Sequence, residues 1–414
     1  MNWSTLRRLA LVAVAAAAAC SPRARQAATP QAATPQAAPH WLGTWASSQQ
    51  LVEPRNMPPA PLANATLRQV IRVSVGGPRL RVTFSNMAGD GPLQIGAARI
   101  ARSMGPGSAA IDTASQRTLS FGGADSVQLA AGKSIVSDPV DLSVAPLSSL
   151  AVTLRFGAVP AALTGHPGSR TTSYIKAGDW VSAPDLANAA TTEHWYVLAN
   201  LDVVAGGAAA VALGNSITDG RGSGTNRDDR WPDDLERRLQ ADPRTARVAM
   251  LNAGIGGNCI LKYCLGPAAL ARLDRDVLDP PGVRWAIVLE GVNDIGDTRS
   301  PEEADSVATG LIAADQQIIA RAHARGLRVY GATITPFGGA GYDRPGHEEA
   351  RQRVNAWIRT SHAFDAVVDF DAAVRDPSDP RRLLPAFDTG DHLHPNEAGY
   401  HAMADAIDLG LFTP

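Results

Sequence analysis

Two short motifs carry side chains that together have the chemistry to cleave an ester bond. Ser216 lies in GNSITDG, directly after an apolar run, and Asp391 lies three residues before His394 in DHLHP. A serine hydroxyl is a poor nucleophile near neutral pH until an imidazole accepts its proton, and a carboxylate keeps that imidazole in the correct tautomer. The motifs therefore predict a serine hydrolase with Ser216 as nucleophile, His394 as base and Asp391 as the orienting carboxylate.

The apolar pattern after residue 206 predicts the elements that must position these side chains. Strands are expected at residues 210–213, 248–251, 285–289, 327–332 and 366–370. Helices are expected near 232–240, 268–278, 301–325 and 347–360, with a last helix beginning near Pro395. Such alternation is typical of an α/β fold with a parallel sheet covered on both faces, whose ligands bind at the carboxyl ends of the strands.

The candidate site residues all follow expected strands. They are Ser216 after the first strand, Gly257 after the second, Asn293 after the third, and Asp391 and His394 between the last strand and the last helix. Each residue by itself is also explained as a turn, a loop acid or a helix cap. Their joint placement at one edge of a sheet favours an active site.

The preceding part of the chain has a different pattern. Short alternating or β-branched runs at 66–75, 79–85, 93–100, 134–141 and 150–156 are separated by clusters rich in Gly, Pro, Asn and Asp. This spacing predicts a β-sandwich or jelly-roll domain over residues 41–206, followed by the hydrolase domain over 207–414. Its tryptophans, Trp41, Trp45, Trp180 and Trp195, either stack on sugars or belong to the core, and the core is favoured.

The N-terminus is typical of an export signal. Arg7 and Arg8 precede an apolar stretch over residues 9–19 that ends at Cys20, so residues 1–20 are interpreted as a lipoprotein-type signal peptide. Residues 21–40, with QAATP twice, are interpreted as a linker. Two locations stay open: an outer-membrane lipoprotein facing the periplasm or cell surface, held through lipidated Cys20, or a secreted protein. Membrane contact is expected only through that anchor.

Composition sets broad limits on the binding partners. The chain has 414 residues, of which 45% are hydrophobic and 19% charged, and its formal net charge is −2. This is enough apolar material for a large core and more than one domain. Basic residues are scattered and not interleaved with aromatic ones, so no nucleic acid is expected as a partner.

Four blocks of the second half resemble the SGNH or GDSL hydrolases. GNSITDG is similar to the first block, NAGIGGN at 252–258 to the second, GVND to the third, and DHLHP to the block that carries Asp and His. The resemblance covers about residues 208–412, and one departure is Asn215, where the family usually has Asp. The preceding β-domain resembles, more loosely, a bacterial subset that includes xylan-associated acetylesterases.

The resemblance implies that the parallel sheet is flavodoxin-like. It also implies an oxyanion hole formed by the Ser216 and Gly257 backbone N–H groups and the Asn293 side-chain amide. No cofactor is expected. A metal site built from Asp391, His392, His394 and His401 is disfavoured, because H-x-H without a further partner at fixed spacing is a weak signal. Cys259 and Cys264 form either a disulfide or two unpaired thiols.

The sequence therefore predicts a serine carboxylic-ester hydrolase. It is expected to deacetylate carbohydrate, or to cleave other short-chain acyl esters, through an acyl-enzyme intermediate, with a small-molecule or polysaccharide ester as substrate. Two alternatives stay open: a lipase or lysophospholipase-like esterase, and a glycan-binding envelope lipoprotein with an inactive hydrolase domain. The five intact site residues, Ser216, Gly257, Asn293, Asp391 and His394, argue against the last of these.

Overall fold

A parallel sheet organises the second half of the chain in the computed structural model. Its strand order is β17 (Val248–Gly254), β16 (Ala208–Gly214), β18 (Val283–Leu289), β19 (Arg328–Ala332) and β20 (Ala366–Val368), and every neighbouring pair is parallel. This 2-1-3-4-5 order is that of flavodoxin-like folds. The predicted fold class of this half is confirmed.

The structure describes residues 39–413, together with residues 13, 15 and 16. The predicted signal peptide with its lipidation site at Cys20 lies outside the described residues, apart from positions 13, 15 and 16. The predicted linker also lies outside them, apart from residues 39 and 40. None of the helices in the described part is long and apolar enough to span a bilayer.

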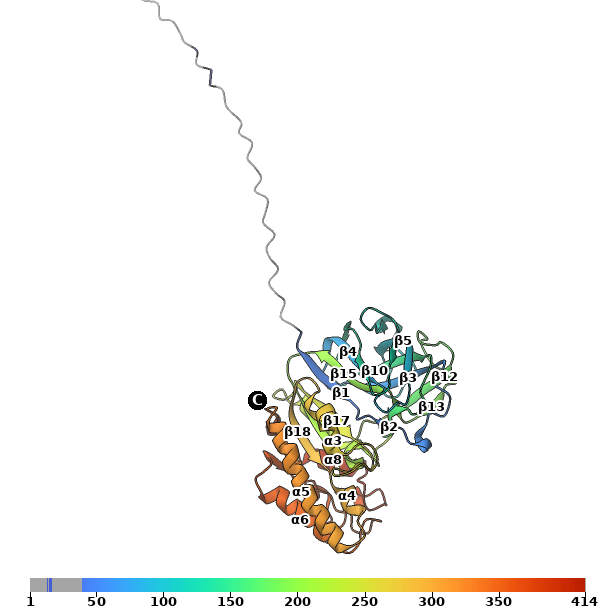
Figure 1. Ribbon diagram of the computed structural model, residues 1–414. Coiled ribbons are helices and arrows are strands. Elements are labelled where there is room, and N and C mark those ends of the chain that lie inside the picture. The colour runs from blue at the N-terminus through green and yellow to red at the C-terminus, as the bar shows by residue number, and fades with distance from the viewer. Residues whose placement is uncertain (1–12, 14, 17–38, 414) are drawn as a thin grey trace, which may run out of the picture. The chain divides into compact units, whose positions relative to one another are not determined.

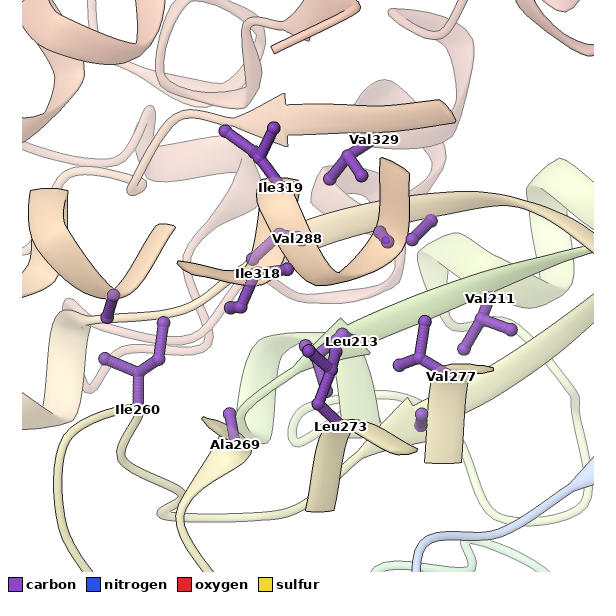
Figure 2. Close-up of a cluster of buried hydrophobic side chains, with 14 of the residues drawn as sticks. Val211, Leu213, Ile260, Ala269, Leu273, Val277, Val288, Ile318, Ile319 and Val329 are labelled. Carbon is purple, nitrogen blue, oxygen red and sulfur yellow. The ribbon is translucent and has the colours of Figure 1, made fainter. Parts of the chain in front are cut away.

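Helices cover both faces of the parallel sheet because side chains alternate along each buried strand. On β16, Ala209, Val211 and Leu213 belong to one apolar cluster, while the even-numbered alanines 208, 210 and 212 belong to another. The first cluster contains α3 (Ala269–Leu273), α5 (Pro301–His323) and α6 (His347–Thr360), and Figure 2 shows part of it around Val211 and Leu213. The second contains α2 (Trp231–Ala241), α7 (Phe370–Val374) and α8 (Glu397–Asp405).

Two of the expected elements show how local contacts move a predicted boundary. The strand expected to reach residue 370 ends at Val368, because the Asp369 side chain accepts a hydrogen bond from the Ala372 N–H and so caps α7. The helix expected over 268–278 is α3 followed by a π-helical turn, Asp274–Leu278. Both differences lie in short segments, where capping and packing decide the boundary.

Antiparallel sheets build the first half. One has the order β13 (Ala190–Thr192), β12 (Ser173–Ala177), β3 (Ala65–Arg72), β10 (Ser149–Phe156), β5 (Leu93–Arg102) and β6 (Arg117–Thr118), with β7 (Val127–Leu129) also on β5. Another has the order β1 (Trp41–Ala46), β15 (Leu198–Val204), β4 (Gly77–Ser85) and β8 (Ser134–Val136), with β9 (Val140–Val144) also on β4. A third joins β14 (Trp195–Tyr196), β11 (Thr164–His166) and β2 (Gln50–Leu51).

The two larger sheets share one buried core, as a β-sandwich requires. Leu67 of β3 and Leu154 of β10 belong to the same apolar cluster as Val82 of β4 and Leu201 of β15. The strand expected over 134–141 is divided into β8 and β9, because Asp138 turns out of the sheet and accepts hydrogen bonds from the Gly122 and Gly123 N–H groups.

The tryptophans of this half do not share one environment. Trp45 and Trp195 are core residues that pack edge to face with ring centroids 4.9 Å apart. Trp41 is half-buried beneath Arg81, whereas Trp180 is exposed and lies beneath Lys176. The core interpretation therefore holds for two of the four.

The antiparallel and parallel halves pack directly on each other, and His40–Pro414 is one compact unit. Leu42 of β1 is buried in the same cluster as Val211 and Leu251 of the parallel sheet, and Figure 1 shows β1 beside β17. Arg72 of β3 forms an ion pair with Glu236 of α2. This packing brings loops of the β half to the carboxyl edge of the parallel sheet.

Candidate active site

The proposed nucleophile lies in a tight turn at the end of β16. Ser216 is the first residue of the short helix α1 (Ser216–Asp219), and the Asn215 side chain caps it by accepting a hydrogen bond from the Ile217 N–H. Asparagine and aspartate are about equally good in this capping position. The one departure from the family's first block therefore leaves the turn intact.

Ser216, His394 and Asp391 form a continuous hydrogen-bonded chain. The Ser216 Oγ atom lies 2.8 Å from His394 Nε2, and His394 Nδ1 lies 2.7 Å from Asp391 Oδ2. Asp391 Oδ1 also accepts the His394 N–H at 2.9 Å, which fixes the carboxylate relative to the ring. The structure thus brings the three residues together in the geometry that serine activation needs.

The loop that carries Asp391 and His394 does not follow β20 directly. After β20 the chain forms α7, and it reaches the edge of the sheet only in the segment that leads into α8. Thr389 holds this segment by donating from its hydroxyl to Asp391 Oδ1, 3.0 Å away, and Asn396 caps α8. The base is therefore placed by a capped helix start and a bonded loop, not by a strand end.

Burial and neighbouring charges set the protonation states of the pair. Burial lowers the pKa of His394, the charges of Arg221 and Arg170 lower it further, and Asp391 opposes them. Burial alone would raise the pKa of Asp391, but hydrogen bonds from the His394 ring and backbone N–H hold it well below the usual range. At neutral pH the arrangement is a neutral imidazole beside an ionised carboxylate.

Three hydrogen-bond donors belong to residues that line the pocket in front of Ser216. They are the backbone N–H groups of Ser216 and Gly257 and the side chain of Asn293, which all line one cavity with His394. Within the described part of the chain, neither backbone N–H has a main-chain acceptor at hydrogen-bonding distance. Gly257 has φ +72°, and a Cβ there would come within 2.6 Å of the Leu265 side chain, so this turn requires glycine.

Neighbouring side chains fix the orientation of the Asn293 amide. Asn293 lies in α4 (Val292–Gly296), and its Nδ2 donates one hydrogen to the Asn258 carbonyl at 2.7 Å. The Tyr342 hydroxyl donates to Asn293 Oδ1 at 3.0 Å, and burial raises the pKa of Tyr342, so it stays protonated. An amide nitrogen has two hydrogens, which leaves one for an oxyanion. The sequence analysis missed Tyr342, since it lies in a loop with no motif.

A residue of the β half supports the nucleophile turn. His166 of β11 lies with Nε2 2.8 Å from Asp219 Oδ1 and with Nδ1 2.9 Å from the Ser48 carbonyl oxygen. The other oxygen of Asp219, the last residue of α1, accepts the Gly256 N–H at 3.0 Å. His166 thus fixes both the turn that carries Ser216 and the turn that carries Gly257. No sequence signal marks it.

The pocket in front of Ser216 has walls from both halves of the molecule. Its volume is about 450 Å³. The β half contributes Gln50, Glu53, Arg55, Pro167, Arg170 and His194, and the α/β half contributes Ser216, Arg221, Gly257, Asn293, Tyr342 and His394. The β half is therefore part of the candidate site.

Comparison with known proteins identifies the family of the second half of the chain. Residues 212–402 match the family model of the GDSL-like Lipase/Acylhydrolase family. The second half of the chain is a GDSL-like hydrolase domain. The chain is accordingly a carboxylic ester hydrolase. A search of curated proteins found no match.

Solved structures similar to the GDSL-like domain cover about half of this chain. A GDSL-like lipase from Bacteroides thetaiotaomicron is 20% identical, with a TM-score of 0.35, over 48% of this chain and 84% of that one. A variant of an acetyl xylan esterase from Geobacillus stearothermophilus is 20% identical, with a TM-score of 0.37, over 48% and 93% of the two chains.

Glu290 lies beneath the nucleophile turn of the GDSL-like domain. Its Oε2 accepts a hydrogen bond of 3.4 Å from Asn215, and its Oε1 lies 3.6 Å from the guanidinium of Arg272. Burial raises the pKa of Glu290 to about 8, with Asp294 adding to the effect and Arg272 opposing it. Because Asn215 caps α1, Glu290 acts on Ser216 through that cap.

The remaining candidate residues of the GDSL-like domain have structural partners. Cys259 and Cys264 are joined in a disulfide, with Cα atoms 5.6 Å apart. The His392 ring lies 2.6 Å from an Asp388 carboxylate oxygen, and His401 lies beside Asp405. Among the described residues, no group of three or more His, Cys, Asp or Glu is arranged to hold a metal ion.

Proposed function

We propose that the protein hydrolyses short-chain acyl esters of carbohydrates, acetyl esters above all, through a covalent intermediate on Ser216. The observation that carries this proposal is the hydrogen-bonded chain from Ser216 through His394 to Asp391, which opens into a pocket lined by three oxyanion donors. The reaction would proceed in two half-reactions, the acylation of Ser216 and the hydrolysis of the acyl-enzyme.

In the first half-reaction, His394 Nε2 takes the Ser216 proton while Oγ attacks the ester carbonyl carbon. The negative charge that develops on the carbonyl oxygen is received by the Ser216 and Gly257 N–H groups and the free Asn293 amide hydrogen. Asp391 stabilises the imidazolium without taking its proton. His394 then gives the proton to the leaving alcohol oxygen as the carbon–oxygen bond breaks.

In the second half-reaction, water replaces the alcohol. His394 removes a water proton as the oxygen attacks the acyl carbon, and the same donors stabilise the second tetrahedral intermediate. His394 returns the proton to Ser216 Oγ, and the carboxylic acid leaves. Side chains and backbone groups of this chain, together with one water molecule, account for each proton transfer and bond change of the cycle.

The lining of the pocket supports a carbohydrate rather than a lipid substrate. Charged and amide side chains of the β half, including Gln50, Glu53 and Arg170, line the same pocket as the oxyanion donors. A long acyl chain would desolvate these groups without hydrogen bonds, whereas sugar hydroxyls pair with them. The expected export signal supports the same substrate class, because an exported enzyme meets polysaccharides whose hydroxyl groups carry acetyl esters.

Two rate measurements test the proposal. The purified protein is expected to hydrolyse p-nitrophenyl acetate and to release acetate from acetylated polysaccharide, and Ser216→Ala is expected to lose both activities. Equal rates for the two proteins would exclude the serine mechanism. A chain-length profile over p-nitrophenyl esters is expected to fall beyond short acyl groups, and a maximum at long chains would instead support the lipase alternative. Glycan binding without any turnover would support the inactive-domain alternative.

A further inference from the structure

The side chain of Arg170 forms no hydrogen bond or ion pair with the described residues. Arg170 lies in the loop between β11 and β12 and lines the same pocket as Ser216 and His394. Its Nε atom is buried without a hydrogen-bond partner. Among the described residues, no carboxylate lies within 4.0 Å of its guanidinium. This differs from Arg272, a buried arginine of the same chain that donates to Asn258, to Asp276 and to backbone carbonyls.

The backbone of Arg170 is held in an uncommon conformation. Its φ is +53°, in the left-handed region that residues other than glycine rarely adopt. The Arg170 carbonyl accepts the Asn226 N–H at 2.8 Å, and the Asn226 side chain bonds both the N–H and the hydroxyl of Thr172 at 2.8 Å. Such strain persists where the surroundings fix it, and it concentrates at functional sites.

The acid of this wall does not neutralise Arg170. Glu53 lines the pocket, but its two carboxylate oxygens accept hydrogen bonds from Gln50 and Asn56, at 2.6 and 2.8 Å. Arg221, from the α/β half, lies 4.0 Å from Asp391, whose oxygens already bind His394. Glu53 keeps its negative charge, but the β half brings both Arg55 and Arg170 to the pocket, so this wall presents net positive charge to a ligand.

The position of the base decides which part of a substrate meets this charge. In ester cleavage, the base returns its proton to the leaving oxygen, so the alcohol part lies against His394 and the acyl part lies beyond the oxyanion donors. Arg221 lies on the His394 side, with its Nε 4.0 Å from Asp391 Oδ2, and Arg170 lines the same pocket as His394. The charges of both arginines add to the burial that lowers the pKa of His394.

We propose that Arg170, assisted by Arg221, binds a carboxylate on the alcohol part of the ester, so that the preferred substrates are acyl esters of sugar acids. This inference rests on the proposed function and narrows its substrate class. A planar guanidinium pairs with a carboxylate through two parallel hydrogen bonds, which orients the sugar as well as binding it.

The test compares two substrates that differ in one charge. Acetate release is measured from monoacetylated methyl galacturonoside and from its methyl ester, for the wild type and for Arg170→Gln. The ratio of the two kcat/KM values is expected to favour the acid in the wild type and to fall about 10- to 100-fold in the variant, as for the loss of a hydrogen bond to a charged group. Arg170→Lys keeps the charge and is expected to retain part of the preference.

The matched control is Arg247→Gln. Arg247 is exposed directly before β17, at the end of the parallel sheet away from the pocket, so its substitution removes one positive charge without touching the site. The control is expected to keep the wild-type ratio. A fall of equal size in the control would overturn the proposal, because it would assign the preference to net charge.

Other outcomes separate failure of this inference from failure of the proposed function. Equal rates on the acid and on its methyl ester in the wild type would overturn the inference while leaving the ester hydrolase intact. No acetate release from either compound or from p-nitrophenyl acetate would contradict the proposed function itself. p-Nitrophenyl hydrogen succinate carries its free carboxylate on the acyl part of the ester. If Arg170→Gln lost activity on this ester but kept it on the sugar acid, Arg170 would bind an anion on the acyl side, and the inference would be overturned.

Discussion

The two walls of the pocket differ in how their charged groups are satisfied. On the α/β wall, Asp391 and His394 are bonded to each other and to the nucleophile, so every group is in place before a substrate arrives. On the β wall, Arg170 is fixed through its backbone while its side chain has an unpartnered Nε. Preorganised groups lower a barrier, and an unsatisfied charge selects a ligand. Under the two proposals above, the α/β wall performs the chemistry and the β wall selects the substrate.

The largest expected effect lies on the α/β wall. Ser216→Ala removes the nucleophile and is expected to lower kcat by about 10⁴- to 10⁶-fold on any ester, charged or neutral, because no covalent step is possible. The measurement is the rate of p-nitrophenol release, with folding checked by the melting temperature. Residual activity within tenfold of the wild type would contradict the assignment of chemistry to this wall.

Asn293→Ala tests the oxyanion donors of the same wall. Removing one donor is expected to lower kcat by about 10²- to 10³-fold and to change KM little, because the interaction strengthens in the transition state. Tyr342→Phe leaves the amide in place but removes the hydroxyl that orients it, so its effect on kcat is expected in the same direction and smaller. A variant that raised KM alone would indicate a ground-state contact instead.

His166→Ala tests whether the β half also supports the chemistry. The variant leaves the buried Asp219 carboxylate without its imidazole partner, beneath the Ser216 and Gly257 turns. We expect kcat to fall about 10- to 100-fold through misplacement of these turns, with a loss of stability of about 1–3 kcal/mol.

His323→Ala is the control for that variant, since it breaks a His–Asp pair of the same length, 2.8 Å, that is exposed and far from the site along the chain. It is expected to change neither kcat nor stability appreciably. An unchanged kcat in His166→Ala would confine the role of the β half to substrate selection and would sharpen the contrast between the walls.

The smallest expected effect is a displacement of the pH profile. His394 acts as base only when neutral, and burial with the charges of Arg221 and Arg170 lowers its pKa, so the acidic limb of kcat/KM is expected to lie below the ordinary histidine value of about 6.5. Arg170→Gln removes one of those charges and should raise the pKa, which moves the limb to higher pH. A limb that stayed in place or moved to lower pH would show that Arg170 does not face the base.

The site was predictable where local sequence determines local geometry. Ser216 lies in a capped turn after an apolar strand, and Gly257 lies in a turn that only glycine tolerates. Both turns can therefore be recognised as short motifs in the sequence. The same holds for the parallel strands, whose buried runs predicted their positions to within two or three residues at nearly every end. The strands of the β half were harder to predict. β15, which pairs with both β1 and β4, has no alternating or β-branched run distinctive enough to be assigned as a separate strand.

The sequence by itself indicated the chemistry: the types and spacing of Ser216, Asp391 and His394 predicted a nucleophile, an orienting acid and a base, and the family resemblance added Asn293 as an oxyanion donor. Only the tertiary structure decided what surrounds them. His166, Arg170 and Tyr342 lie in segments without motifs. His166 and Arg170 reach the site because the antiparallel half packs against the parallel sheet, and Tyr342 reaches it from the loop between β19 and α6. Contacts between segments so far apart along the chain depend on the packing of two cores, which no local pattern encodes.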